Sequence, residues 1–234
     1  MTQSKQDGTG DTDAPDINAT RDQLIAAVLL HVPFDGWSSA ALRRAAEDCS
    51  VAPETATALF PGGARDLINW HSRWADRRMM DALTEGGIED MRIRDRIAFA
   101  VMTRFEQNAG EREAVRAALS FLALPQNGPL AADLLYHTVD DMWFACGDRS
   151  TDWNFYSKRG LLAGVYSSTL MVWLNDESED FQTTRRFLDR RIGNVMAIPK
   201  IKGRVAKVGD VLGFIPRRLK AFRTFRPASV RRSG

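Results

Sequence analysis

Apolar residues recur every three or four positions along most of the chain. That spacing lays them along one face of an α-helix, whereas a half-buried β-strand would alternate apolar and polar residues. No stretch of the sequence sustains such an alternation. The pattern therefore predicts an all-α protein, with helices at about residues 20–33, 39–48, 53–59, 64–83, 93–105, 114–122, 130–145, 155–174 and 181–196.

Turn and capping signals mark the ends of the first helix. The run Thr20-Arg-Asp-Gln23 matches a capping box, in which the Thr20 hydroxyl accepts from a free backbone amide and Gln23 reaches back. Pro33 and the Gly36-Trp37 pair are expected to end the helix. Residues 1–19 hold almost nothing that could be buried, so we expect a disordered arm there.

The first three predicted helices have the lengths and tight turns of a helix-turn-helix. Together with the Phe60-Pro61-Gly62-Gly63 turn before a long fourth helix, they resemble the TetR family of repressors. Such repressors need Lys and Arg at the third helix to neutralise phosphates and polar side chains to read bases. Residues 45–64 contain no Lys or Arg and carry Glu47, Asp48 and Glu54. We therefore expect no nucleic-acid partner, and a TetR-like regulator with a hydrophobic ligand is the alternative function.

Charge is distributed unevenly along the 234 residues, although the net charge is only +2. Residues 1–20 carry one Lys against four Asp, whereas residues 200–234 carry eleven Lys and Arg against Asp210 alone. The remaining residues are therefore acidic. A strongly basic tail points to an anionic partner, which is either a nucleic acid or a membrane surface.

The basic tail also carries a regular apolar stripe. Ile201, Val205, Val208, Leu212, Ile215, Leu219 and Phe222 are spaced alternately four and three residues apart. Such a stripe beside dense Lys and Arg is typical of a helix that lies in the membrane interface, with a kink expected at Pro216. Packing of this stripe on the helical body is the competing interpretation. The membrane-binding residues that we predict are Val208, Leu212, Ile215, Leu219, Phe222, Lys207, Arg217, Arg218 and Lys220.

Residues 139–196 carry the most specific resemblance: VDDMWFACGDRSTDWNFYSKRGLLAGVYSSTLMVWLNDESEDFQTTRRFLDRRIGNVM. This segment is similar to the signature domain of a family of ubiquinone-biosynthesis accessory proteins, the lipid-binding partners of the demethoxyubiquinone hydroxylase. The elements His31-Val-Pro-Phe-Asp-Gly-Trp37 and Leu59-Phe-Pro-Gly-Gly63 also resemble that family.

This resemblance implies a TetR-like fold that binds an isoprenoid quinone or phospholipid ligand in a hydrophobic cavity. It also implies a homodimer formed through the last two body helices and a C-terminal amphipathic helix on the membrane. The expected divisions of the chain are a disordered arm (1–19), a helix-turn-helix-like segment (20–84), a helical lipid-binding and dimerisation domain (85–199) and a membrane-binding tail (200–234).

Residues 155–174 are apolar on nearly every side, which is typical of a central buried helix. One side of this helix has to pack on the body, while another could line a cavity or a dimer interface. With the resemblance, the predicted lipid-binding residues are Leu161, Leu162, Val165, Tyr166, Leu170 and Met171. The alternative is that all six are ordinary core residues.

The hydroxylase-binding patch implied by the resemblance falls beside a polar connection at residues 147–151. Exposed aromatic residues at such a place are typical of partner sites, but the same residues could simply pack the helix junction. The matching positions are Met142, Asp152, Trp153, Phe155 and Tyr156.

No constellation of catalytic residues is recognised. A di-iron bundle would need Glu-x-x-His pairs, yet His31, His71 and His137 follow Val28, Ile68 and Leu134 at that spacing. There is no Gly-rich phosphate loop or nucleophile elbow. We therefore expect a non-enzyme without metal or cofactor.

The expected location follows from the same sequence. The longest mainly apolar run has 15 residues, which is too short to span a bilayer. The acidic N-terminus lacks the features of a secretion signal or transit peptide. We expect a protein of the bacterial cytoplasm, held peripherally on the inner membrane.

Overall fold

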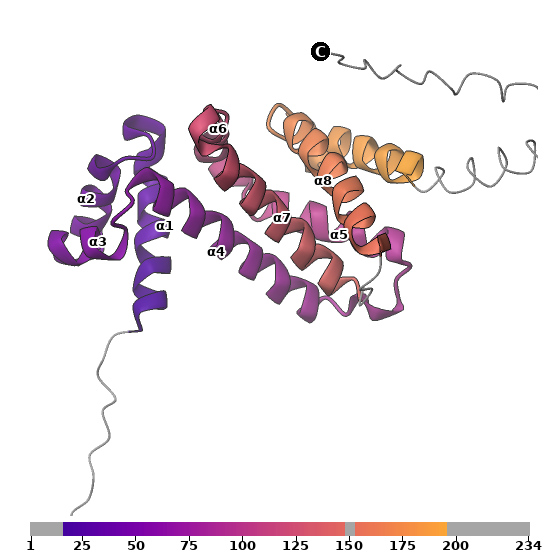
Figure 1. Cartoon of the computed structure of the whole chain (residues 1–234), viewed down its shortest axis with the longest axis horizontal. Coiled ribbons are helices and arrows are strands. Elements are labelled where there is room, and N and C mark those ends of the chain that lie inside the picture. The colour runs from indigo at the N-terminus through magenta and orange to yellow at the C-terminus, as the bar shows by residue number, and fades with distance from the viewer. Residues whose placement is uncertain (1–15, 148–152, 196–234) are drawn as a thin grey trace, which may run out of the picture. The chain divides into compact units, whose positions relative to one another are not determined.

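The computed structural model describes residues 16–147 and 153–195 of the chain, and side chains from Tyr156 onward in the second range. These residues form helices and connecting turns without a strand, so the predicted all-α class is confirmed. The helices are α1 (Ile17–Asp35), α2 (Ser39–Asp48), α3 (Pro53–Leu59), α4 (Ala64–Glu85), α5 (Ile93–Glu106), α6 (Arg112–Leu122), α7 (Gly128–Ala145), α8 (Trp153–Trp173) and a last helix over 182–195 (Figure 1).

The first helix differs from the prediction at both ends. Asp16 is its N-cap and accepts from Asn18 N at 2.9 Å, while the Thr20 hydroxyl donates to the Asp16 carbonyl from inside the first turn. The predicted capping box at Thr20 is therefore wrong. At the other end the helix continues through Pro33 to Asp35, because a proline in the last turn removes only one helical hydrogen bond. Gly36, with a φ of 65°, then ends the helix.

Helices α1, α2 and α3 pack into a small unit on the body. Their buried side chains share one apolar core with α4, α6 and α7, and α1 lies against α2, α4 and α6. Trp37 fixes this junction, since its indole Nε1 donates to the Ala114 carbonyl of α6 at 2.9 Å. Its ring also packs on His71 of α4, with centroids 5.2 Å apart. The helix-turn-helix-like unit is thus attached to the elements that carry the site described below.

The body is organised around α4 and α7. The long α4 packs along α5 and α7, and α8 packs on α7 and α5. Phe105 of α5 stacks on Trp173 of α8, with the rings 5.2 Å apart and nearly parallel, and both side chains are fully buried. None of the helices within the described residues is long and apolar enough to cross a membrane.

Asp176 joins α8 to the last helix. Its buried carboxylate accepts from the backbone amides of Ser178 and Thr184 at 2.9 and 2.8 Å and from both their hydroxyls at 2.5 and 2.6 Å. These donors outweigh the effect of burial and lower the pKa of Asp176 to about 2. Asp176 therefore caps the helix at 182–195.

Replacing this carboxylate by an amide tests its role. Because the pKa of Asp176 is lowered in the folded state, its stabilising effect is complete above pH 4 and is lost as the pH falls toward 2. We expect Asp176→Asn to lower the free energy of unfolding at pH 7 by about 1–3 kcal/mol. The variant should also lose less stability than wild type between pH 4 and pH 2, as measured by urea denaturation.

The exposed neighbour Glu177 provides the matched control. Glu177→Gln should leave both the stability at pH 7 and its acid dependence unchanged. Equal stability losses on acidification in wild type and Asp176→Asn would show that the cap does not contribute to acid sensitivity.

Candidate functional site

A largely apolar cavity lies where α4, α5, α6, α7 and α8 meet. Its volume is about 490 Å³, which falls in the range of about 300–1,000 Å³ typical of small-molecule sites. Each of these five helices contributes apolar wall residues: Ile68, Phe105, Val115, Ala118, Leu119, Leu122, Ala131, Leu134, Leu135, Leu170, Met171 and Trp173. The cavity can therefore accept an apolar molecule without unfolding any helix.

Helix α8 presents only its C-terminal half to this cavity. Tyr166, Leu170 and Met171 line it, as the sequence predicted for wall residues. Leu162 and Val165 do not line it and are buried between helices, and Leu161 is partly exposed. Because α8 is apolar on nearly every side, its sequence does not indicate which side faces the cavity, and lipid binding by these three residues stays a prediction.

The walls contributed by the other helices were missed as a site. Phe105, Ala118, Leu122 and Leu134 fall on the apolar stripes that predicted the helices. A stripe that lines a cavity has the same spacing as a stripe that fills a core. Only the packing of five helices distinguishes the two.

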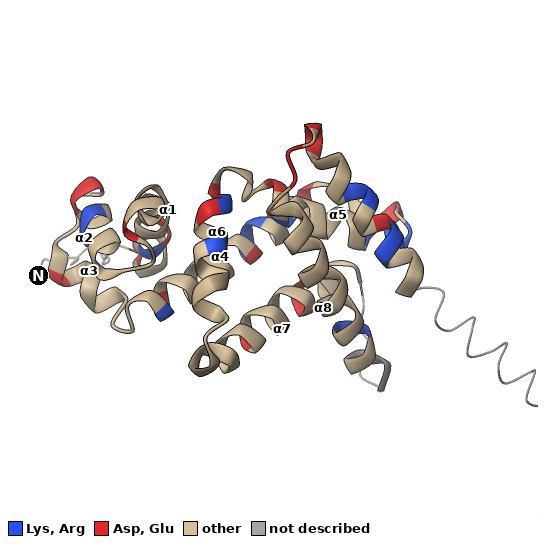
Figure 2. Cartoon of the chain, turned by 90° about the horizontal axis from the view of Figure 1, so that it is seen from above, with Lys and Arg blue, Asp and Glu red and all other residues tan. Residues whose placement is uncertain are grey.

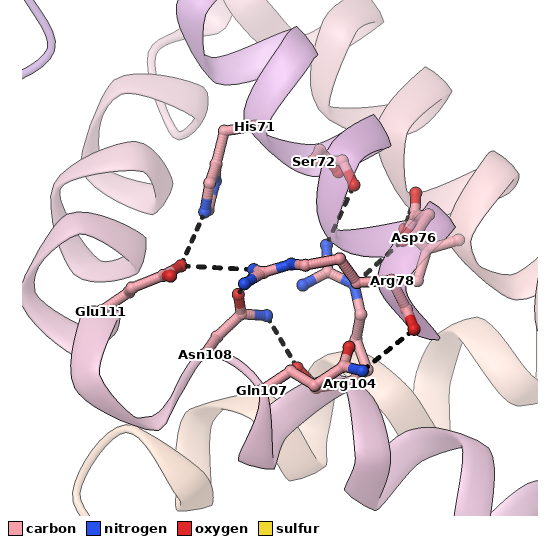
Figure 3. A network of polar contacts seen from close by, with 9 residues as sticks. His71, Ser72, Asp76, Arg78, Arg104, Gln107, Asn108 and Glu111 are labelled. Atoms are coloured by element: carbon pink, nitrogen blue, oxygen red, sulfur yellow. Dashed lines mark hydrogen bonds and ion pairs between the residues drawn. The ribbon is translucent and has the colours of Figure 1, made fainter. Parts of the chain in front are cut away.

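One wall of the cavity is polar and is built on a buried ion pair. Arg104 Nε donates to Asp76 Oδ1 at 2.9 Å, and both side chains are almost fully buried. The Thr138 hydroxyl of α7 lies 3.0 and 3.1 Å from the two Asp76 oxygens, and Arg104 Nη2 donates to the Ser72 carbonyl at 3.3 Å. These contacts connect α4, α5 and α7 at the cavity (Figure 3).

A second set of polar contacts lies beside this wall. Glu111 lies 3.1 Å from His71 Nε2 and 3.6 Å from Arg78 Nη2. Arg78 also donates to the Asn108 side chain at 2.9 Å, as Figure 3 shows. Burial lowers the pKa of His71, although its contact with Glu111 opposes that shift, so we treat the imidazole as neutral at pH 7.

Comparison of the sequence with known proteins identifies one family. The COQ9 family model matches residues 128–199. The mitochondrial ubiquinone biosynthesis protein COQ9 of Rattus norvegicus is 33% identical over 214 residues, covering 88% of this chain and 68% of the rat protein. COQ9 of Homo sapiens is 31% identical over 214 residues, covering 88% and 67%. The chain belongs to the COQ9 family.

The fold has a solved counterpart among DNA-binding regulators. A TetR transcriptional regulator from Nitrosomonas europaea superimposes with a TM-score of 0.62 and 21% identity, covering 75% of this chain and 97% of the regulator. This likeness shows a TetR-like fold. In this COQ9 family member α3 carries Glu54 and has no Lys or Arg (Figure 2).

The predicted hydroxylase-binding residues divide into buried, exposed and undescribed positions. Met142 is 0% exposed, so its side chain packs inside the helix junction. Tyr156 is 68% exposed on α8. Asp152 and the side chains of Trp153 and Phe155 lie outside the described residues. Phe144 of α7, which is 66% exposed, was not predicted as part of this patch.

Within the described ranges no three His, Cys, Asp or Glu side chains cluster as a metal site would require. The predicted membrane-binding residues, from Lys207 to Phe222, lie outside the described residues.

A double-mutant cycle tests the ion pair in the cavity wall. Removing one member leaves a buried charge without its partner, so Arg104→Met should lower the free energy of unfolding by about 3–5 kcal/mol. Replacing both members, in Asp76→Leu/Arg104→Met, should restore much of that loss. Chemical denaturation of the two single variants and the double variant measures the coupling.

The exposed pair of Arg73 and Asp133, at 3.1 Å, is the control. Arg73→Met should cost less than about 1 kcal/mol. Additive effects of the two buried substitutions would contradict the coupling that the geometry requires.

Proposed function

We propose that this COQ9 family member is a non-catalytic, lipid-binding accessory protein of ubiquinone biosynthesis. It binds isoprenoid quinone precursors at the membrane and presents them to the demethoxyubiquinone hydroxylase. The apolar cavity between α4 and α8 is the observation that carries this proposal. Family membership supports the role in ubiquinone biosynthesis, because the rat and human relatives carry that process in their names.

The chemistry of the cavity suits an isoprenoid tail. Branched hydrocarbon makes no hydrogen bonds, and each buried methylene contributes about 0.8 kcal/mol to transfer from water. Side chains such as Phe105, Leu119 and Leu134 offer it apolar contacts on several sides. A protein that encloses such a tail can carry a water-insoluble precursor to a partner enzyme.

The C-terminal residues 200–234 support the membrane part of the proposal. Their Lys and Arg alternate with the apolar stripe described above. Each basic residue near an anionic bilayer contributes about 1 kcal/mol, so several together hold a protein reversibly at the surface. We place the protein peripherally on the inner face of a bacterial inner membrane.

In this proposal the hydroxylase binds at the junction of α7 and α8. Tyr156 and Phe144 are large, exposed aromatic side chains there, and such residues are enriched among interface hot spots. The hydroxylation itself is assigned to the partner. Two copies of the chain pair through α8 and the helix at 182–195 in this proposal.

Filling the cavity tests the lipid-binding role. Ala131 lines the cavity from α7, and its neighbour Ala132 is exposed and does not line it. Ala131→Trp should reduce several-fold the isoprenoid lipid that co-purifies with the full chain, because the indole occupies space that the tail needs. Ala132→Trp should not change it, with lipid quantified by mass spectrometry of organic extracts. Equal lipid content in the two variants would contradict binding in this cavity.

Removing an exposed aromatic residue tests the partner surface. Tyr156→Ala should weaken binding to the demethoxyubiquinone hydroxylase by about 2 kcal/mol, or roughly 30-fold, if it is a hot spot. Because the side chain is 68% exposed, the melting temperature should stay within a few degrees of wild type. Biolayer interferometry with immobilised hydroxylase measures the affinity.

The control for this surface is Phe34→Ala, since Phe34 is 86% exposed on α1. That variant should bind the hydroxylase like wild type. An unchanged affinity for Tyr156→Ala would remove Tyr156 from the interface.

A further inference from the structure

One arginine side chain fastens the end of α7 to the rest of the body. Arg96 lies in the first turn of α5, and its Nη1 donates to the Cys146 carbonyl at the end of α7 at 3.0 Å. Its Nε donates to the Met91 carbonyl at 2.8 Å, and its Nη2 donates to the Glu89 carbonyl. The guanidinium thus joins α5, the turn that precedes it and the last turn of α7.

This contact acts as a C-cap that is supplied by another helix. The last carbonyls of a helix have no partner within it and carry the negative end of the helix dipole, so a cation at that end is favourable. The planar fork of arginine can donate to several carbonyls in fixed directions, whereas a lysine ammonium is a compact point charge. The three hydrogen bonds of Arg96 therefore require an arginine.

The backbone next to this contact leaves room for the guanidinium. Gly147 has a φ of 85°, in the region that favours glycine. A Cβ atom at this position would lie 3.4 Å from Arg96 Nη1. Any other residue would strain the backbone and crowd the arginine, so Gly147 and Arg96 depend on each other.

The turn that Arg96 holds carries part of the proposed partner surface. Phe144, which is 66% exposed, lies in this last turn of α7. Helix α8, which carries the exposed Tyr156, is fastened to α7 because Arg159 Nε donates to the Asp140 carboxylate. The position of both aromatic side chains on the body therefore depends on where α7 is held.

We propose that Arg96 is a positioning residue for partner binding. By capping α7 it holds Phe144 and Tyr156 in the arrangement that the hydroxylase recognises. This inference rests on the proposed function, because it adds a residue that supports the partner surface from behind. Arg96 is only half-buried and its hydrogen bonds involve turns and a helix end, so its loss should free the last turn of α7 without unfolding the body.

Two substitutions test this contact from its two sides. Arg96→Lys keeps the positive charge but loses the fork, and Gly147→Ala keeps the arginine but crowds it. Each should weaken binding of the full chain to immobilised demethoxyubiquinone hydroxylase about 5- to 20-fold, measured below the melting temperature of every variant. The double variant should lose less than the product of the two single effects, because both substitutions disrupt one contact.

Hydrogen–deuterium exchange of the free protein gives a second readout that does not need the hydroxylase. The amides of Cys146 and Gly147 donate to the Met142 and Phe144 carbonyls and close the last turn of α7. Both amides should exchange faster in Arg96→Lys and in Gly147→Ala than in wild type.

Arg92→Lys is the matched control, since Arg92 is exposed and lies four residues before Arg96. It should change neither the affinity nor the exchange. Wild-type affinity in Arg96→Lys would overturn the inference, and so would a lowered melting temperature with an unchanged affinity of the folded protein. Both results would leave hydroxylase binding by wild type intact. Failure of wild type to bind the hydroxylase would overturn the inference together with the partner binding in the proposed function.

Discussion

The guanidinium of Arg104 is held in the interior of the body by one carboxylate, and the arrangement around the cavity depends on that contact. Asp76 comes from α4, Arg104 from α5 and Thr138 from α7, so the pair and its hydroxyl partner join three of the five helices that enclose the cavity. A buried charge without its partner is strongly destabilising, whereas a pair of this kind contributes little net stability compared with apolar packing. Arg104 makes this part of the otherwise apolar cavity wall polar.

A second set of contacts, centred on His71, connects the cavity to the helix-turn-helix-like unit. His71 lines the cavity, contacts Glu111 and packs against Trp37, which in turn donates to the Ala114 carbonyl of α6. The TetR-like fold is thus kept, with α1–α3 attached to the body that encloses the cavity. The acidic third helix lacks the positive charge that phosphate contacts require. The fold of this molecule therefore does not by itself indicate its function.

Much of the fold could be predicted from the spacing of apolar residues alone. Each apolar stripe extends over several helical turns, so one misread residue does not change the predicted helix. The start of α1 was misplaced since both Asp16 and Thr20 are good capping residues, and only the backbone conformation decides between them. The site was harder to predict from the sequence. Tyr166 and Leu170 face the cavity and Leu162 and Val165 do not, although all four lie on one apolar helix. The Asp76–Arg104 pair joins residues 28 positions apart on different helices, and no local pattern indicates such a contact.

Native mass spectrometry of the full chain, purified without detergent and incubated with isoprenoid quinone precursors, tests the central claim most directly. The account predicts that the folded protein carries an isoprenoid quinone precursor as a non-covalent adduct, and that collisional activation releases it intact. Folded protein that remains free of any isoprenoid lipid under these conditions would contradict the claim that the cavity is a lipid-binding site.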